Sequence, residues 1–286
     1  MNIKMIVLDL DGTLLTSEKV IDPITQEKLL EAQKQGIMLV IATGRDKGSI
    51  PFVAEPLQLE KGQNFVAGVN GQVIYDYAKK EYTLDTVFDG DDASYIMALG
   101  KKYNVEVVTC CGHDYFDFLS RRLKFKKHLR KLLYGEPVDY GFKKGKQRFF
   151  MIHDVTYRFT QDINKFVLIQ TAEYLKKHLP AIRKELENSK YELLEVGPAW
   201  IEIMPKGVSK GSAITRIAKE HGIKKEEIMA FGDAENDVSM FDAVGYGIAM
   251  GNAMDMIKEK AYAITDTNDA CGIAKALDQY VLEKEN

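Results

Sequence analysis

Two carboxylates stand directly after an apolar run near the amino terminus. The run Met5–Leu8 is followed by Asp9, Leu10 and Asp11, and then by Gly12. Such a run is typical of a buried strand, and residues two apart in a strand point the same way, so Asp9 and Asp11 can face one crevice. Phosphoryl transfer uses such a pair, one carboxylate as nucleophile and the other as acid for the leaving alkoxide. We expect Asp9 to be the nucleophile and Asp11 to be the acid and base.

A second acidic motif lies far along the chain. A strand predicted over 228–231 leads into Gly232, and then come Asp233, Asn236 and Asp237. Strands of an α/β sheet present ligand-binding side chains at their carboxyl ends, so the two acidic motifs can build one site. The set of oxygen ligands favours Mg²⁺ over zinc or copper.

Other interpretations of these motifs are weaker. A calcium loop of the EF-hand type fails because Gly12 falls at its fourth position and Leu14 takes the place of its glycine. An acidic turn without function would explain Asp9 and Asp11 alone, but it leaves the second motif unexplained. The glycines in 245–251 miss the dinucleotide-binding spacing by one residue, and the sequence contains no P-loop motif.

Two further segments are suited to holding a phosphate. Thr43, Gly44 and Arg45 follow a strand predicted over 37–42, and they offer a hydroxyl, open backbone amides and the start of a helix. Lys210 opens another predicted helix, from which its ammonium can reach an anion in the crevice. Taken alone, the first segment would be an ordinary turn and the second a solvated lysine.

The elements that position these residues alternate between strand and helix. Asp22-Pro23 opens a helix that ends at Gly36, and strands are predicted over 37–42 and 65–69. Strand–helix–strand repeats of this length predict parallel strands joined by right-handed crossovers. The same rhythm returns after Pro205, where Ser209 is expected to cap the helix that carries Lys210.

Between these two parts the pattern changes to shorter strands mixed with charged helices. A hairpin is predicted from 191–196 and 200–204, turned at Gly197-Pro198. We therefore expect an α/β protein whose Rossmann-like, parallel-sheet core comprises residues 1–83 and 204–286. Residues 84–203 are expected to form an α+β domain inserted into that core.

The predicted insertion contains a strongly basic segment. Between Ser120 and Arg148, eleven lysine or arginine residues stand against only two acidic ones. The segment 121–131 suits an exposed helix with one buried apolar stripe, since apolar residues occur at 123, 125, 129, 132 and 133. A solvated face is one explanation, and attraction of an anionic substrate is another. Nucleic-acid binding fits less well because the whole chain has a net charge of −3.

Composition narrows the class of protein. The chain has 286 residues, of which 45% are hydrophobic and 28% charged, as is usual for a globular protein. No run of eighteen apolar residues occurs, so no transmembrane helix is expected. The three cysteines, Cys110, Cys111 and Cys271, include two neighbours and lack zinc-site spacing, which favours a reducing, cytoplasmic location over a disulfide framework.

The motifs in this order resemble those of the haloacid dehalogenase (HAD) superfamily. The segment from Asp9 to Thr13 is similar to the first motif of that superfamily, Thr43 to the second, Lys210 to the third and 232–237 to the fourth. An insertion of this length between the second and third motifs is similar to that of Cof-type phosphatases, in which it forms a cap of the C2 type. Asn70-Gly71, 207–211 and 251–253 also resemble that subfamily.

This resemblance implies roles for the motif residues. Asp9 would form an aspartyl-phosphate, while Asp11 would protonate the leaving group and then activate water. The Mg²⁺ ligands would be Asp9, the Asp11 backbone carbonyl and Asp233, with Asp237 in support. The groups holding the phosphate would be the Leu10 main chain, Thr43, Gly44, Lys210 and Asn236.

The resemblance implies a Mg²⁺-dependent phosphatase that hydrolyses phosphomonoesters of small metabolites such as sugar phosphates. A phosphomutase and a catalytically silent phosphometabolite-binding protein are the alternatives. We expect the partner to be a small phosphorylated metabolite, and we expect neither a nucleic-acid nor a membrane partner.

Overall fold

The computed structural model of the chain describes residues 1–45, 51–112, 114–135 and 148–282. The chain divides into two compact units. The core unit comprises Met1–Asp85 and Val208–Asn286, and the inserted unit comprises Thr86–Gly207. Within the described ranges, no helix combines the length and the apolar composition needed to cross a bilayer.

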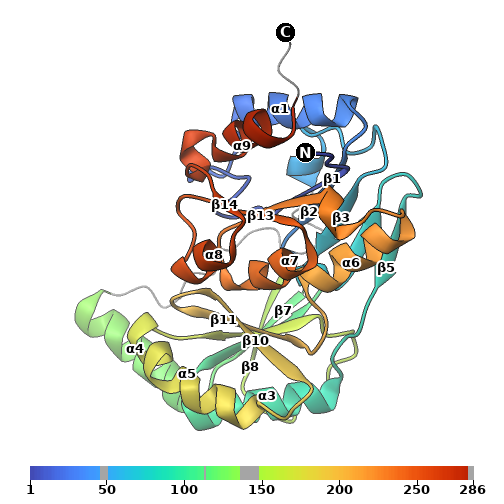
Figure 1. The fold of residues 1–286 in the computed structure, drawn as a ribbon. Helices are drawn as coiled ribbons and strands as arrows, with labels where there is room; N and C mark the ends of the chain where they lie inside the picture. The colour runs from blue at the N-terminus through green and yellow to red at the C-terminus, as the bar shows by residue number, and fades with distance from the viewer. Residues whose placement is uncertain (46–50, 113, 136–147, 283–286) are drawn as a thin grey trace. The chain divides into compact units, whose positions relative to one another are not determined.

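The core unit is built on an eight-stranded sheet (Figure 1). The strand order is β14-β13-β12-β1-β2-β3-β4-β5, and the strands from β14 to β3 are parallel, while β4 and β5 are antiparallel. Nearly every residue of the central strands is buried, as expected for parallel strands covered on both faces. The strands are β1 (Met5–Leu8), β2 (Met38–Ala42), β3 (Phe65–Gly68), β4 (Val73–Asp76), β5 (Glu81–Leu84), β12 (Ile228–Gly232), β13 (Tyr246–Ala249) and β14 (Ala263–Ile264).

Helices cover both faces of this sheet, with α1 and α9 on one face and α6, α7 and α8 on the other (Figure 1). The predicted caps are confirmed: Asp22 accepts hydrogen bonds from Ile24 N and Thr25 N at the start of α1, and Ser209 accepts one from Ser212 N at the start of α6. The helices are α1 (Pro23–Lys34), α2 (Pro51–Ala54), α6 (Lys210–Glu220), α7 (Val238–Ala243), α8 (Asp255–Lys260) and α9 (Gly272–Tyr280).

The strand register brings the predicted motifs together. Leu8 of β1 pairs with Ile41 of β2 on one side and with Phe231 of β12 on the other. The chain leaves β1 toward β2 and leaves β12 toward β13, so the strand order changes direction here. Such a switch point at the carboxyl ends of parallel strands is where α/β proteins bind ligands. The strand register thus confirms that the two acidic motifs meet at one end of the sheet, and it places the segment that follows β2 beside them.

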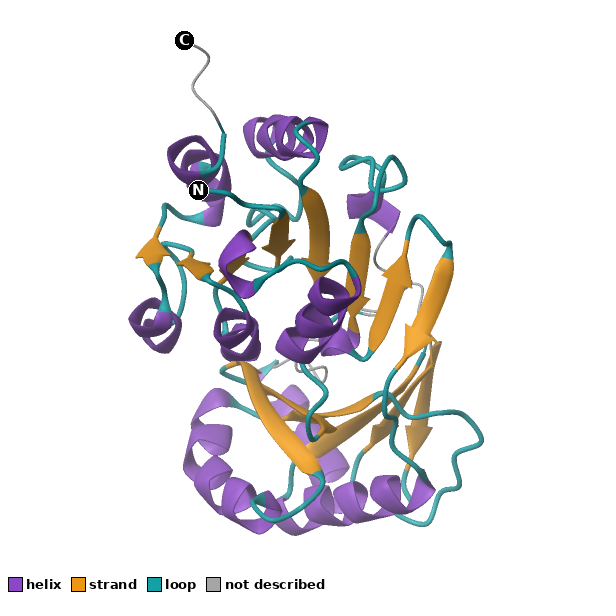
Figure 2. Ribbon diagram, turned by 45° about the vertical axis from the view of Figure 1, so that its right-hand side comes forward, coloured by secondary structure: helices purple, strands orange, loops and turns teal. Residues whose placement is uncertain are grey.

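The inserted unit contains a six-stranded sheet with helices along one face (Figure 2). Apolar residues of α3 and α5 pack against that face in a single core cluster. The elements are α3 (Gly90–Tyr103), β6 (Glu106–Cys111), β7 (Asp114–Phe118), α4 (Arg121–Tyr134), β8 (Arg148–Ile152), β9 (Lys165–Ile169), α5 (Ala172–Leu186), β10 (Tyr191–Gly197) and β11 (Trp200–Pro205).

The basic segment forms α4 as predicted, but the predicted apolar stripe is wrong. Leu123 is buried, whereas Phe125, Leu129, Leu132 and Leu133 are exposed. At 100° per residue, Phe125 lies about 200° around the helix from Leu123, so these residues do not share one face with it. The buried face instead contains Leu123 and Lys127, whose ammonium pairs with the buried Glu106. The rest of the basic segment, residues 136–147, lies outside the described ranges.

Candidate active site

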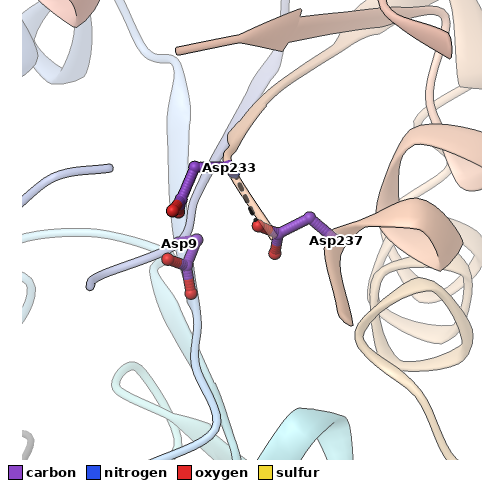
Figure 3. Close-up of side chains that lie close together, drawn as sticks. All are labelled: Asp9, Asp233 and Asp237. Atoms are coloured by element: carbon purple, nitrogen blue, oxygen red, sulfur yellow. Dashed lines mark hydrogen bonds between the residues drawn. The ribbon is translucent and has the colours of Figure 1, made fainter. Parts of the chain in front are cut away.

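Three carboxylates converge at the carboxyl ends of β1 and β12 (Figure 3). Asp9 follows β1, Asp233 follows β12, and Asp237 ends the short helix η4 (Glu235–Asp237). One oxygen from each carboxylate lies within 4.8 Å of the others. Asp9 and Asp237 are buried and Asp233 is partly so, and burial makes mutual repulsion between such groups strong.

Lys210 supplies a positive charge inside this cluster. Its side chain is fully buried, and its Nζ lies 2.5 Å from Asp9 Oδ1 and 2.6 Å from Asp237 Oδ1. Burial lowers the pKa of Lys210, but the carboxylates of Asp237 and Asp9 outweigh it and raise that pKa above its usual value. Lys210 is therefore a permanent cation that links the first motif to the fourth.

Close packing of α6 on α7 lets Lys210 reach this position. Lys210 is the first residue of α6, and the next residue, Gly211, packs against the backbone carbonyl of Ser239 in α7. A Cβ at Gly211 would collide with that carbonyl, so only glycine permits this approach.

Asp237 is held entirely by groups of the core unit. Its Oδ1 binds Lys210, and its Oδ2 accepts hydrogen bonds from the backbone N–H groups of Asp233 at 2.8 Å and Ala234 at 3.1 Å. The carboxylate therefore fixes the loop that carries Asp233. This arrangement suits Asp237 to support a metal site rather than to supply a free ligand oxygen.

Asp9 and Asp233 each keep one oxygen available. Asp9 Oδ1 is bound by Lys210, and Asp233 Oδ1 accepts a 2.8 Å hydrogen bond from Thr13 Oγ1. Among the described residues, no donor reaches Oδ2 of either carboxylate. Burial, with the neighbouring Asp237, raises the pKa of Asp233 to about 6, and burial also raises the pKa of Asp9. Crowded hard oxygens of this kind fit a small divalent cation, which would offset the repulsion.

Asp11 lies in a more open environment than the other carboxylates. Arg45 contacts both of its oxygens, with Nε 2.7 Å from Oδ2 and Nη2 2.7 Å from Oδ1, and Lys19 Nζ lies 2.7 Å from Oδ1. Burial raises the pKa of Asp11, but the hydrogen bonds from Arg45 and Lys19 outweigh it and lower that pKa to about 2. The two cations therefore hold Asp11 ionised in this arrangement.

The groups predicted to hold a phosphate lie along the same edge. Leu10 follows Asp9 with its side chain buried, and its N–H finds no acceptor among the described residues. Thr43 and Asn236 are also buried, and Gly44 follows Thr43 at the end of β2. The helix predicted to start directly after Arg45 falls on residues 46–50, which lie outside the described ranges.

Sequence reasoning missed three contacts of this site. In the sequence Arg45 stands out only as part of its motif, whereas in the structure its guanidinium fork binds the Asp11 carboxylate. Asn70 resembles only a subfamily motif in the sequence, whereas in the structure its side chain contacts Asn236. Lys19 gave no signal, because it lies in a loop and carries no motif. Lys19 has a positive φ of 63°, and no turn motif in the sequence predicts this backbone conformation.

Comparison with known proteins identifies the family. A family model described as haloacid dehalogenase-like hydrolase matches residues 6–277, and the chain belongs to this family. A putative phosphatase of Streptococcus pyogenes is 30% identical over 282 residues, covering 99% of this chain and 100% of that protein.

Two further relatives carry more specific descriptions. A 5-amino-6-(5-phospho-D-ribitylamino)uracil phosphatase of Bacillus subtilis is 30% identical, covering 98% of this chain and 97% of that protein. A solved structure described as a HAD subclass IIB sugar phosphatase is 25% identical and has a TM-score of 0.73, covering 97% of this chain and 98% of that one. The expected fold, a HAD core with an inserted cap, is confirmed, and the chain is a HAD-type phosphatase.

Proposed function

We propose that this protein is a Mg²⁺-dependent phosphatase for phosphomonoesters of small, sugar-phosphate-like metabolites. One observation carries the proposal: buried Lys210 holds Asp9 by Oδ1, while no donor among the described residues reaches Asp9 Oδ2. A carboxylate fixed at one oxygen and open at the other is suited to attack phosphorus. Membership of the HAD-like hydrolases supports this chemistry.

The first step forms a phosphoenzyme. Asp9 Oδ2 attacks phosphorus, a P–O bond forms, and the bond from phosphorus to the ester oxygen breaks. The leaving oxygen takes a proton from the carboxyl group of Asp11. This step requires Asp11 to gain a proton and to leave its contact with Lys19, since Arg45 and Lys19 together favour its ionised form, while the fork of Arg45 keeps the carboxyl group in place.

The second step returns the enzyme to its starting state. Asp11, now a carboxylate, accepts a proton from a water molecule whose oxygen attacks phosphorus. The bond between phosphorus and Asp9 Oδ2 breaks, inorganic phosphate leaves, and the carboxylate of Asp9 is restored. Throughout both steps Lys210 balances charge next to Asp9 and Asp237.

The proposed metal ligands are Asp9, the backbone carbonyl of Asp11 and Asp233, with Asp237 in support. The close approach of the three carboxylates, and Asp233 Oδ2, which no described donor reaches, fit a divalent cation. When bound, such a cation neutralises charge on the phosphoryl oxygens. The proposed phosphate contacts are the Leu10 N–H, Thr43, Gly44, Lys210 and Asn236.

The proposed substrate class rests on the relatives. One acts on a phosphoribityl compound and another is a sugar phosphatase, by their descriptions. We also propose that the inserted unit, expected at 84–203, is the cap that selects among such substrates, and that the enzyme acts in the cytoplasm, where its three cysteines stay reduced.

A turnover assay separates the proposed function from its alternatives. The purified protein is incubated with Mg²⁺ and p-nitrophenyl phosphate, and then with a panel of sugar phosphates, while phosphate release and sugar isomers are measured. We expect stoichiometric phosphate release. Isomerisation without release would indicate a phosphomutase, and binding without turnover would indicate a silent protein.

The variant Asp9→Asn tests the nucleophile. An amide keeps the shape of the side chain but cannot attack phosphorus, so turnover should fall by about 10³-fold or more. Removal of one charge from the acidic cluster should leave the fold intact, as circular dichroism and thermal unfolding would show. A folded variant that retains a tenth of the wild-type turnover would contradict the assignment.

A further inference from the structure

The turn after β3 joins two segments of the proposed phosphate site. This turn, η2 (Val69–Gly71), holds Asn70 fully buried in the left-handed region, with φ 53° and ψ 36°. The N–H of Asn70 donates to the carbonyl of Thr43 at 2.8 Å, and the N–H of Val69 donates to the carbonyl of Arg45 at 2.9 Å. The backbone of the turn therefore fixes the loop from Thr43 to Arg45.

The side chain of Asn70 reaches a third segment. Its Oδ1 accepts a 3.0 Å hydrogen bond from Nδ2 of the buried Asn236. An added Cβ on Gly44 would lie 3.1 Å from the same oxygen. Asn70 Oδ1 thus lies between Gly44 and Asn236, both of which are proposed phosphate contacts.

The next residue of the turn contacts the helix that carries Lys210. Gly71 has φ +91°, and a Cβ there would collide with the backbone carbonyl of Ser209, the cap of α6. One short turn is therefore in contact with the loop after β2, the start of α6 and the loop after β12. These three segments lie far apart along the chain, and the turn fixes their positions relative to one another.

We propose that Asn70 is a positioning residue that orients the amide of Asn236 for phosphate. A carboxamide has a donor end and an acceptor end of nearly equal size, and only the donor end can bind an anion. Asn70 Oδ1 accepts one N–H of Asn236 and leaves the second N–H of the same nitrogen for a phosphate oxygen. This inference rests on the proposed function, because it assumes that Asn236 contacts phosphate.

The key variant is Asn70→Gly, which removes the side chain but keeps a residue that adopts positive φ at little cost. It is compared with Asn236→Ala and with the double variant. Dissociation constants for inorganic phosphate are measured by calorimetry in the presence of Mg²⁺, together with kcat and KM for p-nitrophenyl phosphate. Urea unfolding of each variant checks the fold.

We expect each single variant to weaken phosphate binding about tenfold, the usual effect of one lost charge-assisted hydrogen bond. The double variant should bind phosphate no more weakly than Asn236→Ala alone, since Asn70 acts through Asn236. KM should rise in parallel with the dissociation constant. Independent, multiplying losses, or unchanged binding in Asn70→Gly, would overturn the proposal.

A second variant covers the case in which Asn70→Gly does not fold. Asn70→Asp keeps the acceptor oxygen and tolerates positive φ, so Asn236→Ala must still cost about tenfold in phosphate binding in that background. If Asn236→Ala did not weaken phosphate binding in the Asn70→Asp background, the proposal would be overturned. Phosphate binding without turnover by the wild-type protein would overturn only the proposed function, whereas absence of phosphate binding would overturn both.

Discussion

Arg45 contacts both carboxylate oxygens of Asp11, each at 2.7 Å. A planar guanidinium fixes the orientation of a carboxylate in a way that a single ammonium cannot. The contact joins the loop after β2 to the loop after β1, so it fixes the orientation of the Asp11 carboxylate in the site. Lys19 contacts only Oδ1, from an exposed side chain.

These two contacts predict different kinetic consequences. In Arg45→Lys the charge is kept but the two-point contact is lost, so kcat should fall about tenfold as Asp11 becomes misplaced. The control Lys19→Gln keeps the Arg45 contact, and kcat should stay within about threefold of the wild type. Steady-state kinetics with p-nitrophenyl phosphate measures both, and a larger effect in Lys19→Gln would contradict the role given to Arg45.

Removal of the buried ammonium should destabilise the core unit. In Lys210→Met the carboxylates of Asp9 and Asp237 lose their shared cation, and a broken buried pair typically costs about 3–5 kcal/mol in the free energy of unfolding. Urea unfolding in metal-free buffer at pH 7 measures this loss. Adding Asp237→Asn to Lys210→Met should recover part of the stability, because one uncompensated charge disappears. A loss below about 1 kcal/mol in Lys210→Met would contradict this account.

The proposed metal site predicts a strict choice between ions. Activity should vanish after exhaustive chelation and return with Mg²⁺, while Ca²⁺ should restore little. Few protein oxygens and several waters suit a small octahedral ion, whereas Ca²⁺ favours more ligands at longer distances. Turnover measured with a series of divalent metals tests this prediction. Full activity in the presence of chelator would contradict the proposed metal site.

Much of the core unit could be predicted because its signals are local. Apolar runs in the sequence predict the strands β1, β2, β3 and β12, and cap residues predict the starts of the helices α1 and α6. Since parallel strands align their carboxyl ends, the acidic motifs had to meet once the strand order placed β1 between β2 and β12. The burial of Lys210 did not follow from its place at the start of a helix, because that place alone fits a solvated lysine.

Other features depend on packing between distant segments. Nothing near Asn70 in the sequence shows that its side chain meets Asn236, because that contact depends on how the turn packs at the edge of the sheet. The burial of Lys127 was equally hidden, since its partner Glu106 lies in another element and balances its charge. Periodicity counts apolar residues and therefore assigns a buried lysine to the wrong face.

Asp92 predicts a pH-dependent contribution to the stability of the inserted unit. Its buried carboxylate accepts hydrogen bonds from Tyr191 Oη at 2.6 Å and Asp89 N at 3.0 Å, and Lys190 Nζ lies 2.7 Å away. Burial raises the pKa of Asp92, but Lys190 and Tyr191 outweigh it and lower that pKa. A lowered folded-state pKa stabilises the protein above the unfolded value of about 4, and this stabilisation is lost as the pH falls through the folded-state pKa.

The test compares Asp92→Asn with Asp91→Asn, an exposed neighbour on the same turn of α3. At pH 7 we expect Asp92→Asn to lower the free energy of unfolding by about 1–2 kcal/mol, and Asp91→Asn to change it by less than about 0.5 kcal/mol. The Asp92→Asn difference should shrink as the pH falls below about 4. Urea unfolding at several pH values measures this difference. If the difference in the free energy of unfolding grew as the pH fell, the predicted pH dependence would be wrong.

Two cations of α4, the exposed Lys126 and the half-buried Lys124, lead to a prediction about the rate of substrate association and its salt dependence. If the basic segment attracts phosphorylated substrates, replacing Lys124 and Lys126 with Gln should lower kcat/KM for multiply charged substrates at low salt and flatten its salt dependence. Lys127 is left in place, because it is buried in its pair with Glu106 and cannot attract a substrate from solution. The value of kcat should change little, since Asp9 and Asp11 are untouched.

The matched control replaces Lys176 and Lys177 of α5, two exposed lysines of the same unit, with Gln. It removes the same charge from another helix, so any loss that both variants share reflects net charge alone. Steady-state kinetics at two salt concentrations compares them. A loss of kcat/KM confined to the α4 variant and to low salt supports attraction by this helix, whereas unchanged kcat/KM at low salt means that its lysines form only a solvated face.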